Sequence, residues 1–180
     1  MNTGTENLTL SEKINKLSNF MEEHNYSLTH FLVNTEIVKS KKHEMGRIAK
    51  EFIPAGTTIA IIGGVFIDYV DEYIAMPLGS GVYLHQVNNN RKGTINHSCD
   101  PNCIMFELNK LTALRDICIN EELNIDYGST VAGKGGVVIA DCKCDTPACR
   151  HVITSHDYLT MPEEKLSGLA KAVKQAKLKL

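Results

Sequence analysis

The chain has 180 residues, of which 43% are hydrophobic and 22% are charged, so it is long enough for one globular domain with a sizeable core. Its 19 Lys and Arg residues nearly balance its 21 Asp and Glu residues, which argues against a general nucleic-acid or membrane-surface binder. No apolar run approaches the roughly 18 residues of a transmembrane helix, and the first residues do not form a secretory signal. We therefore expect an intracellular protein, cytoplasmic or nuclear, whose six cysteines are reduced.

Helical periodicity is visible at both ends of the chain. Near the N-terminus, Thr9 and Glu12 have the spacing of a capping box, and apolar residues then recur on one face. Near the C-terminus, Thr160 and Glu163 have the same spacing, and lysines occupy the polar face that follows. We interpret the first segment as a helix that packs at the domain edge and the second as a solvated surface helix whose late lysines suit the negative end of its dipole. Contact with an acidic partner, or a dimer interface, is the alternative for the C-terminal one.

Between these ends the chain consists of short β-like runs separated by turn residues. We expect strands at 31–38, 57–62, 64–70, 82–87, 103–108 and 111–115. Pro54-Ala55-Gly56 marks a turn, and Asn109-Lys110 has the position of a hairpin tip. Residues 129–140 contain three glycines and one charge, which favours a flexible connection. Because helices do not alternate regularly with the strands, a mainly antiparallel β-protein is predicted.

Three segments in the second half of the chain carry residue types that suggest chemistry. They read NHSCDPN at 96–102, EELNIDYG at 121–128 and CKCDTPACR at 142–150. The first could be an Asx-rich turn, and the second could be a loop that leads into a strand. The third contains three cysteines in eight residues, which is unusual for buried apolar positions and typical of a metal site.

The cysteine segment is one ligand short of a structural zinc site. Zinc in such sites is tetrahedral and closed by four ligands, whereas the segment supplies three thiolates. The remaining cysteines of the chain are Cys99, Cys103 and Cys118. Spacing alone does not choose among them.

In this order and spacing, the three segments resemble those of SET-domain protein lysine methyltransferases with a post-SET zinc segment. The resemblance covers roughly residues 31–155 and includes Gly46-Arg47-Ile48-Ala49, which looks like the opening strand of that family. It implies a mainly β SET fold of several small curved sheets, with a knot-like crossing at the active site and short helices at both termini. The expected organisation is an N-terminal helical leader (1–30), a SET domain (31–128), a linker with the post-SET zinc segment (129–155) and a C-terminal helix (156–180).

The resemblance also implies an activity. Such enzymes transfer a methyl group from S-adenosyl-L-methionine to the side-chain amine of a lysine in a protein, here a histone or another basic protein. Tyr127 matches the active-site tyrosine of the family. Three acidic residues, Asp68, Asp71 and Glu72, would favour a substrate with a basic tail.

Further site residues follow from the same resemblance. Asn96 and His97 match positions that bind the methyl donor, and Gly46 and Arg47 would present backbone to it. Tyr83 is a candidate for lining the donor site or the lysine channel. For the zinc ion, Cys99 would join the three cysteines of the third segment, Cys142, Cys144 and Cys149. Cys103 and Cys118 would then be buried thiols.

Departures from the family pattern keep a second function open, a catalytically silent SET-like module that binds a protein. Glu44 replaces the first glycine of a G-x-G turn, and Thr94-Ile95 replaces the frequent Arg-Phe before NHSC. Asn120 replaces a glycine before Glu-Glu-Leu, which is a mild change because Asn tolerates positive φ. A cysteine hydrolase built on Cys99 is disfavoured because no orienting partner is evident. No direct contact with nucleic acid or membrane is expected, and the sequence does not specify an oligomeric state.

Overall fold

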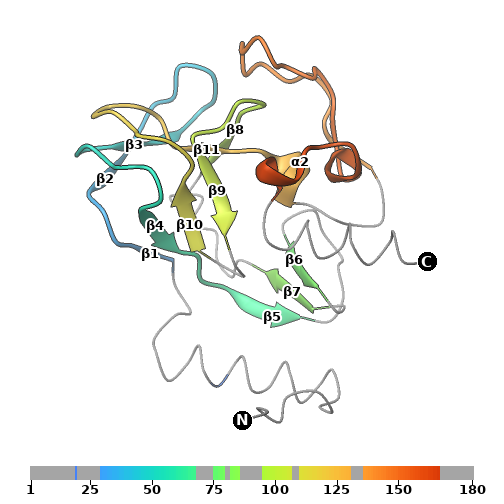
Figure 1. Ribbon diagram of the computed structural model, residues 1–180, viewed down its shortest axis with the longest axis horizontal. Helices are drawn as coiled ribbons and strands as arrows, with labels where there is room; N and C mark the ends of the chain where they lie inside the picture. The colour runs from blue at the N-terminus through green and yellow to red at the C-terminus, as the bar shows by residue number, and fades with distance from the viewer. Residues whose placement is uncertain are drawn as a thin grey trace.

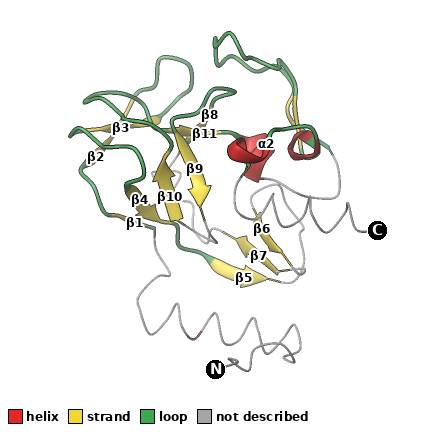
Figure 2. Ribbon diagram, viewed as in Figure 1, coloured by secondary structure: helices red, strands yellow, loops and turns green. Residues whose placement is uncertain are grey.

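The computed structural model describes residues 29–67, 75–79, 82–85, 95–106, 110–130 and 136–166, together with Asn19. The helix expected near the N-terminus lies outside these ranges apart from Asn19, as do residues 167–180 and the acidic residues at 68, 71 and 72. The described part of the expected C-terminal helix, 156–166, contains two short 3-10 turns instead of one continuous helix. Small antiparallel sheets dominate the described part, which confirms the expected mainly β class (Figure 2). No helix in the described part is long and apolar enough to cross a membrane.

The largest of the described sheets has four antiparallel strands in the order β1-β4-β10-β9 (Figure 1). Their bounds are β1 His30–Phe31, β4 Thr58–Ile61, β10 Lys110–Ala113 and β9 Cys103–Phe106. Strand β4 is central, and Ile59 and Ala60 are both completely buried on it. Strand β10 alternates, so that Leu111 and Ala113 point into the core. Strands β9 and β10 pair as expected, although Lys110 belongs to β10 rather than to the tip.

Smaller sheets surround this one. A three-stranded antiparallel sheet has the order β5-β7-β6, with bounds β5 Val65–Ile67, β7 Val82–His85 and β6 Ala75–Gly79. Two antiparallel pairs are formed by β2 Thr35–Val38 with β3 Gly46–Ala49, and by β12 Val137–Ile139 with β13 Ile153–Thr154. A parallel pair joins β8 Asn96–His97 to β11 Asn124–Ile125. Short helical turns follow at α2 Tyr127–Thr130, η2 Asp157–Leu159 and η3 Glu163–Lys165.

Three sequence-based expectations about elements were wrong. The run 31–38 is not one strand, because its start pairs with β4 in one sheet and its end pairs with β3 in another. The connection 129–140 is ordered at both ends, since α2 includes its first two residues and β12 lies near its end. Thr160 does not cap a helix: it donates to the Asp157 carbonyl, and η3 begins after Pro162 without a side-chain cap.

The main core lies between the four-stranded sheet and strand β3 with the turns next to it. Its buried members are Ala49, Ile53, Ile59, Ala60, Ile62, Cys103, Met105, Leu111, Ala113, Ile117 and Leu123. Cys103 is therefore buried as expected, but Cys118 is exposed, contrary to the expectation. The reason is local, because Ile117 occupies the inward position and Cys118 enters the turn that follows. That turn places Asn120 at φ 66°, which confirms that asparagine replaces glycine there at a left-handed position.

Candidate active site and metal centre

The segments at 96–102 and 121–128, called the NHSC and DY segments from here on, cross at the parallel pair of β8 and β11. Asn96 lies opposite Asn124 and His97 lies opposite Ile125, although more than 25 residues separate the partners. Asn102, which is completely buried, secures the crossing. Its backbone N–H donates to Asn124 Oδ1 at 3.2 Å, and its own Oδ1 accepts from the Asn124 N–H at 2.9 Å. The two segments that the sequence analysis singled out are therefore side by side.

Tyr127 begins α2 immediately after this crossing. Its hydroxyl donates a hydrogen bond to the Ile95 carbonyl at 2.9 Å, so the crossing fixes the direction of the hydroxyl proton. Burial raises the pKa of Tyr127, and the phenol therefore stays neutral near pH 7. The hydroxyl oxygen is left as an acceptor for other groups.

His97 links Tyr127 to a cysteine. Its Nδ1 accepts the Tyr127 backbone N–H at 3.1 Å, so Nε2 carries the ring proton and faces Cys99 Sγ at 3.3 Å. Burial lowers the pKa of His97 to about 4, and the ring is therefore neutral at pH 7. The imidazole also packs against the Tyr127 ring, with the two centroids 5.4 Å apart.

A cavity of about 260 Å³ opens beside the crossing. It is lined by Asn96, His97 and Tyr127 from the crossing, by Lys42 and His43 from the 40–45 loop, and by residues 139 and 141–143. Three of the predicted site residues thus meet at one cavity. Gly46 and Arg47 are not among its lining residues, and the side chain of Tyr83, which lies on β7, falls outside the described part.

Gly46 lies directly against the side-chain carboxylate of Glu122. A Cβ atom at position 46 would lie 2.3 Å from Glu122 Oε1 and 3.1 Å from Asn96 Nδ2. The Glu122 carboxylate accepts from Asn96 Nδ2 at 2.6 Å and from Ser40 Oγ at 2.9 Å. Asn96 Nδ2 donates its second hydrogen to the Met45 carbonyl at 2.8 Å. The missing side chain at Gly46 therefore makes room for Glu122, which connects the 40–45 loop to Asn96 at the cavity.

Arg47 points away from the cavity. Its guanidinium lies over the Phe31 ring, 3.8 Å from the centroid, and donates to Thr35 Oγ1 at 2.7 Å. Its backbone carbonyl accepts the Leu123 N–H at 2.7 Å. These contacts hold β3 against β1, β2 and the DY segment.

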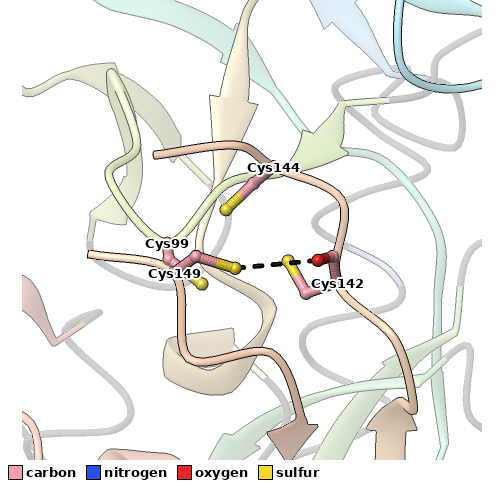
Figure 3. Close-up of side chains that lie close together, drawn as sticks. All are labelled: Cys99, Cys142, Cys144 and Cys149. Atoms are coloured by element: carbon pink, nitrogen blue, oxygen red, sulfur yellow. Dashed lines mark hydrogen bonds between the residues drawn. The ribbon is translucent and has the colours of Figure 1, made fainter. Parts of the chain in front are cut away.

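Four cysteine sulfurs converge between β8 and the 142–149 segment, and Figure 3 shows them pointing toward one another. The Sγ atoms of Cys99, Cys142, Cys144 and Cys149 all lie within 4.8 Å of one another. Tetrahedral zinc with bonds of about 2.3 Å places its sulfur ligands roughly 3.8 Å apart, so the cluster fits a structural zinc site.

Burial and hydrogen bonds shift the pKa of three cysteines in the cluster. Burial raises the pKa of Cys99 to about 11 and that of Cys142 to about 12. At Cys144, burial acts in the same direction, but hydrogen bonds, first among them one with Thr146, outweigh it and lower the pKa to about 6. Zinc would displace the protons from the crowded thiols, because only thiolates bind the ion.

The sequence analysis did not single out three residues that connect the segments around this site: Glu122, Lys42 and Arg150. The Lys42 ammonium donates to the Cys144 carbonyl and lies 3.9 Å from Asp145 Oδ2, so it joins the 40–45 loop to the cysteine segment. Arg150 contacts the residue before Tyr127. Glu122 and Arg150 both lie inside quoted motifs, but nothing in those motifs indicates their distant partners.

Comparison with known proteins agrees with the resemblance to SET-domain lysine methyltransferases. Residues 44–128 match the family model described as the SET domain. Histone-lysine N-methyltransferase set1 of Dictyostelium discoideum is 34% identical over 138 residues, which cover 64% of this chain and 9% of that protein. The H3 lysine-4 specific histone-lysine N-methyltransferase of Chaetomium globosum is 33% identical over 145 residues, covering 64% and 13%.

A solved structure of similar fold is KRYPTONITE in complex with mCHH DNA, an H3(1–15) peptide and SAH. It aligns with a TM-score of 0.53 and 24% identity, over 69% of this chain and 30% of that one. The chain thus spans only a small part of the length of the curated relatives that it matches.

Proposed function

Residues 44–128 of this chain are a SET domain with histone-lysine methyltransferase homologues, and from this premise we propose that the protein is a protein-lysine methyltransferase. The reaction would transfer a methyl group from S-adenosyl-L-methionine to the side-chain amine of a lysine in a protein substrate. The observation that carries the proposal is the parallel pairing of β8 with β11, beside which Tyr127, Asn96 and His97 line one cavity. The SAH and H3 peptide bound to KRYPTONITE support the choice of donor and acceptor.

The site must first make the lysine amine neutral, since only the neutral amine is a nucleophile. At an ordinary pKa near 10.4, about one lysine in a few thousand is neutral at pH 7, a cost of roughly 4 to 5 kcal/mol. A buried environment of the kind that raises the pKa of Tyr127 also disfavours an ammonium ion. When bound, S-adenosyl-L-methionine supplies a methyl group on a positively charged sulfonium, which disfavours the ammonium further.

Tyr127 is suited to orient the amine. Its hydroxyl proton is committed to Ile95, so its oxygen can accept an N–H from the incoming amine and hold its lone pair in one direction. Because the phenol stays neutral, we assign this oxygen an orienting role. The hydrogen bond from the Tyr127 N–H to His97 keeps the start of α2 in place.

The donor site would use Asn96. Both of its amide hydrogens are committed to Met45 and Glu122, which leaves Oδ1 as the group to accept from the ammonium of the donor. The cavity volume is slightly below the range of about 300–1,000 Å³ that is typical of ligand sites.

Zinc would be held by Cys99, Cys142, Cys144 and Cys149. Residues 141–143 are among those that line the cavity, so ordering of the cysteine segment would also shape the donor site. We therefore propose that the functional unit is the SET domain together with the cysteine segment through residue 155.

The test is methyl transfer from radiolabelled S-adenosyl-L-methionine to core histones, with a matched pair of tyrosine variants. We expect labelled lysine with the wild type, and a rate lowered about 100-fold by Tyr127→Phe, since one misplaced reacting group can cost that much. Tyr158→Phe is the control, because Tyr158 is also buried, at 2% exposed, but packs with Met161 and Leu166 outside the cavity. It should retain the wild-type rate.

Calorimetry with SAH separates the ways in which this proposal could fail. A wild-type protein that binds SAH but labels neither histones nor a proteome extract would be a silent binding module. One that binds no SAH would contradict both the donor site and the activity.

A further inference from the structure

Arg150 holds the residue that precedes Tyr127 in the chain. Its guanidinium makes a two-point contact with the Asp126 carboxylate, with Nη1 at 2.7 Å from Oδ2 and Nη2 at 2.6 Å from Oδ1. Its Nε donates to Asp157 Oδ2 at 3.0 Å. The Asp126 side chain is only 2% exposed. A two-point pairing of this kind fixes the orientation of both groups as well as their distance.

Asp126 transmits this constraint to the helical turn that begins with Tyr127. Its Oδ1 accepts the Gly128 N–H at 2.9 Å, and its carbonyl accepts both the N–H and the hydroxyl of Ser129, at 3.0 and 2.7 Å. Tyr127 lies between the residue that Arg150 holds and the two residues that Asp126 holds. A shift of the Asp126 carboxylate would therefore turn or displace the start of α2.

Gly128 gives an independent indication that the packing here is tight. A Cβ atom at this position would lie 2.8 Å from the Cβ of Asp157 and 3.1 Å from Arg150 Nη2. The guanidinium and Asp157 thus pack directly against the backbone that follows Tyr127. Asp157 is itself held, because its Oδ1 accepts from the hydroxyl and the N–H of Thr154.

Arg150 also belongs to the cysteine segment. It directly follows Cys149, and its backbone N–H points to Cys99 Sγ at 3.4 Å. The same residue thus contacts the sulfur cluster through its backbone and the start of α2 through its side chain.

We propose that Arg150 is a positioning residue for Tyr127 and acts on it through Asp126. This inference rests on the proposed methyltransferase function, for which Tyr127 is the orienting group. If Arg150 is lost, the buried Asp126 carboxylate loses both hydrogen bonds to the guanidinium, and His97 Nδ1, at 3.8 Å from Oδ1, lies beyond hydrogen-bond distance. The carboxylate must then find water or a new position. Tyr127 then loses the geometry that its hydroxyl needs, although the cavity and its donor contacts remain.

The experiment compares Arg150→Ala and Arg150→Lys with Arg115→Ala. Arg115 is the matched control, because it also pairs with a carboxylate, Glu121 at 2.6 Å, but is 55% exposed. Methyl transfer to core histones should show kcat lowered about 100-fold by Arg150→Ala, with the KM for the donor changed less than about threefold. Lysine keeps the positive charge but cannot make the two-point contact, so kcat should be about tenfold higher for Arg150→Lys than for Arg150→Ala. Arg115→Ala should stay within about twofold of the wild type.

Zinc content and SAH affinity are measured on the same preparations, and they distinguish positioning from general damage. We expect Arg150→Ala to keep about one zinc per chain and wild-type SAH affinity. The inference is overturned if this variant keeps kcat within threefold, or if it loses zinc, SAH binding and kcat together and lysine restores none of them. If Arg150→Ala does not fold, the kcat of Arg150→Lys decides, and a wild-type value overturns the inference.

Amide hydrogen exchange tests the inference even where the proposed function fails. If the wild type transfers no methyl group, the activity is wrong, but the exchange of residues 127–130 still reports on the turn. We expect exchange there to be at least about tenfold faster in Arg150→Ala, with the β4 amides unchanged. Unchanged exchange at 127–130 would show that Arg150 does not hold the start of α2.

Discussion

Gly46→Ala is the substitution whose effect the structure defines most sharply. The new methyl group would lie 2.3 Å from Glu122 Oε1, so the carboxylate has to move. Moving it breaks the hydrogen bonds from Asn96 at 2.6 Å and Ser40 at 2.9 Å. Hydrogen bonds to charged groups contribute about 1.5–3 kcal/mol each, and water would replace part of that at a half-buried carboxylate. We expect a loss of about 3 kcal/mol in the free energy of unfolding.

Thermal unfolding of the purified protein measures this loss. For a chain of this size, about 3 kcal/mol corresponds to a decrease in Tm of roughly 6–12 °C. SAH calorimetry should also show an affinity lowered at least about tenfold, because Asn96 loses one of its two anchors and the 40–45 loop is released. Gly56→Ala is the control: it has open space around it and a φ of +81°, so it should cost about 1 kcal/mol of backbone strain and leave SAH affinity unchanged.

A double-mutant cycle with Glu122→Ala tests the cause. Once the carboxylate is absent, the methyl group at position 46 meets no obstacle from it, so the second substitution should add less than about 1 kcal/mol. The reasoning is refuted if Gly46→Ala is as stable as the wild type, or if the costs of the two substitutions simply add.

Three further predictions concern the cysteines. Cys144→Ser should lower the zinc content from about one to near zero per chain and abolish methyl transfer, whereas Cys118→Ser should change neither; a fully active, metal-free Cys144→Ser protein would contradict the zinc site. In the zinc-loaded native protein, a thiol reagent should modify Cys118 rapidly and leave Cys103, which is completely buried, unmodified until the chain unfolds; a fast reaction at Cys103 would contradict the core. Burial raises the pKa of Cys103 to about 12, above its ordinary value near 9, so the folded state holds this proton longer than the unfolded state. Stability should therefore fall as the pH rises from about 9 to 12, by on the order of 4 kcal/mol, and Cys103→Ala should show a shallower decrease in denaturant titrations at these pH values.

The cysteine segment has two structural links to the rest of the site. Lys42 joins it to the 40–45 loop beside the cavity, and Arg150 joins it to the start of α2. Both links use residues next to, or in contact with, the backbone of cysteines in the cluster. Loss of order in that segment should therefore affect the donor cavity and Tyr127 together.

Several features follow from short stretches of sequence, and the comparisons and the structure confirm them. The SET fold and the relation to histone-lysine methyltransferases were readable from three motifs in a fixed order. The hairpin of β9 and β10, the turn at Gly56 and the left-handed conformation of Asn120 were all indicated by the residue types at those positions, although distant backbone groups also bond to the two turns. Local propensity is enough to indicate such features because the residue types themselves favour these backbone conformations.

The tertiary structure alone decided which groups meet across the chain. Ser40 contacts Glu122 over 82 residues, and Arg150 contacts Asp126 over 24. It also decided that Cys118 is exposed while Cys103 is buried, and that the space at Gly46 is filled by a carboxylate. The pattern of residues along the sequence does not predict these pairings. They arise only when the crossing of β8 and β11 brings distant segments together, because buried polar groups there then need hydrogen-bond partners.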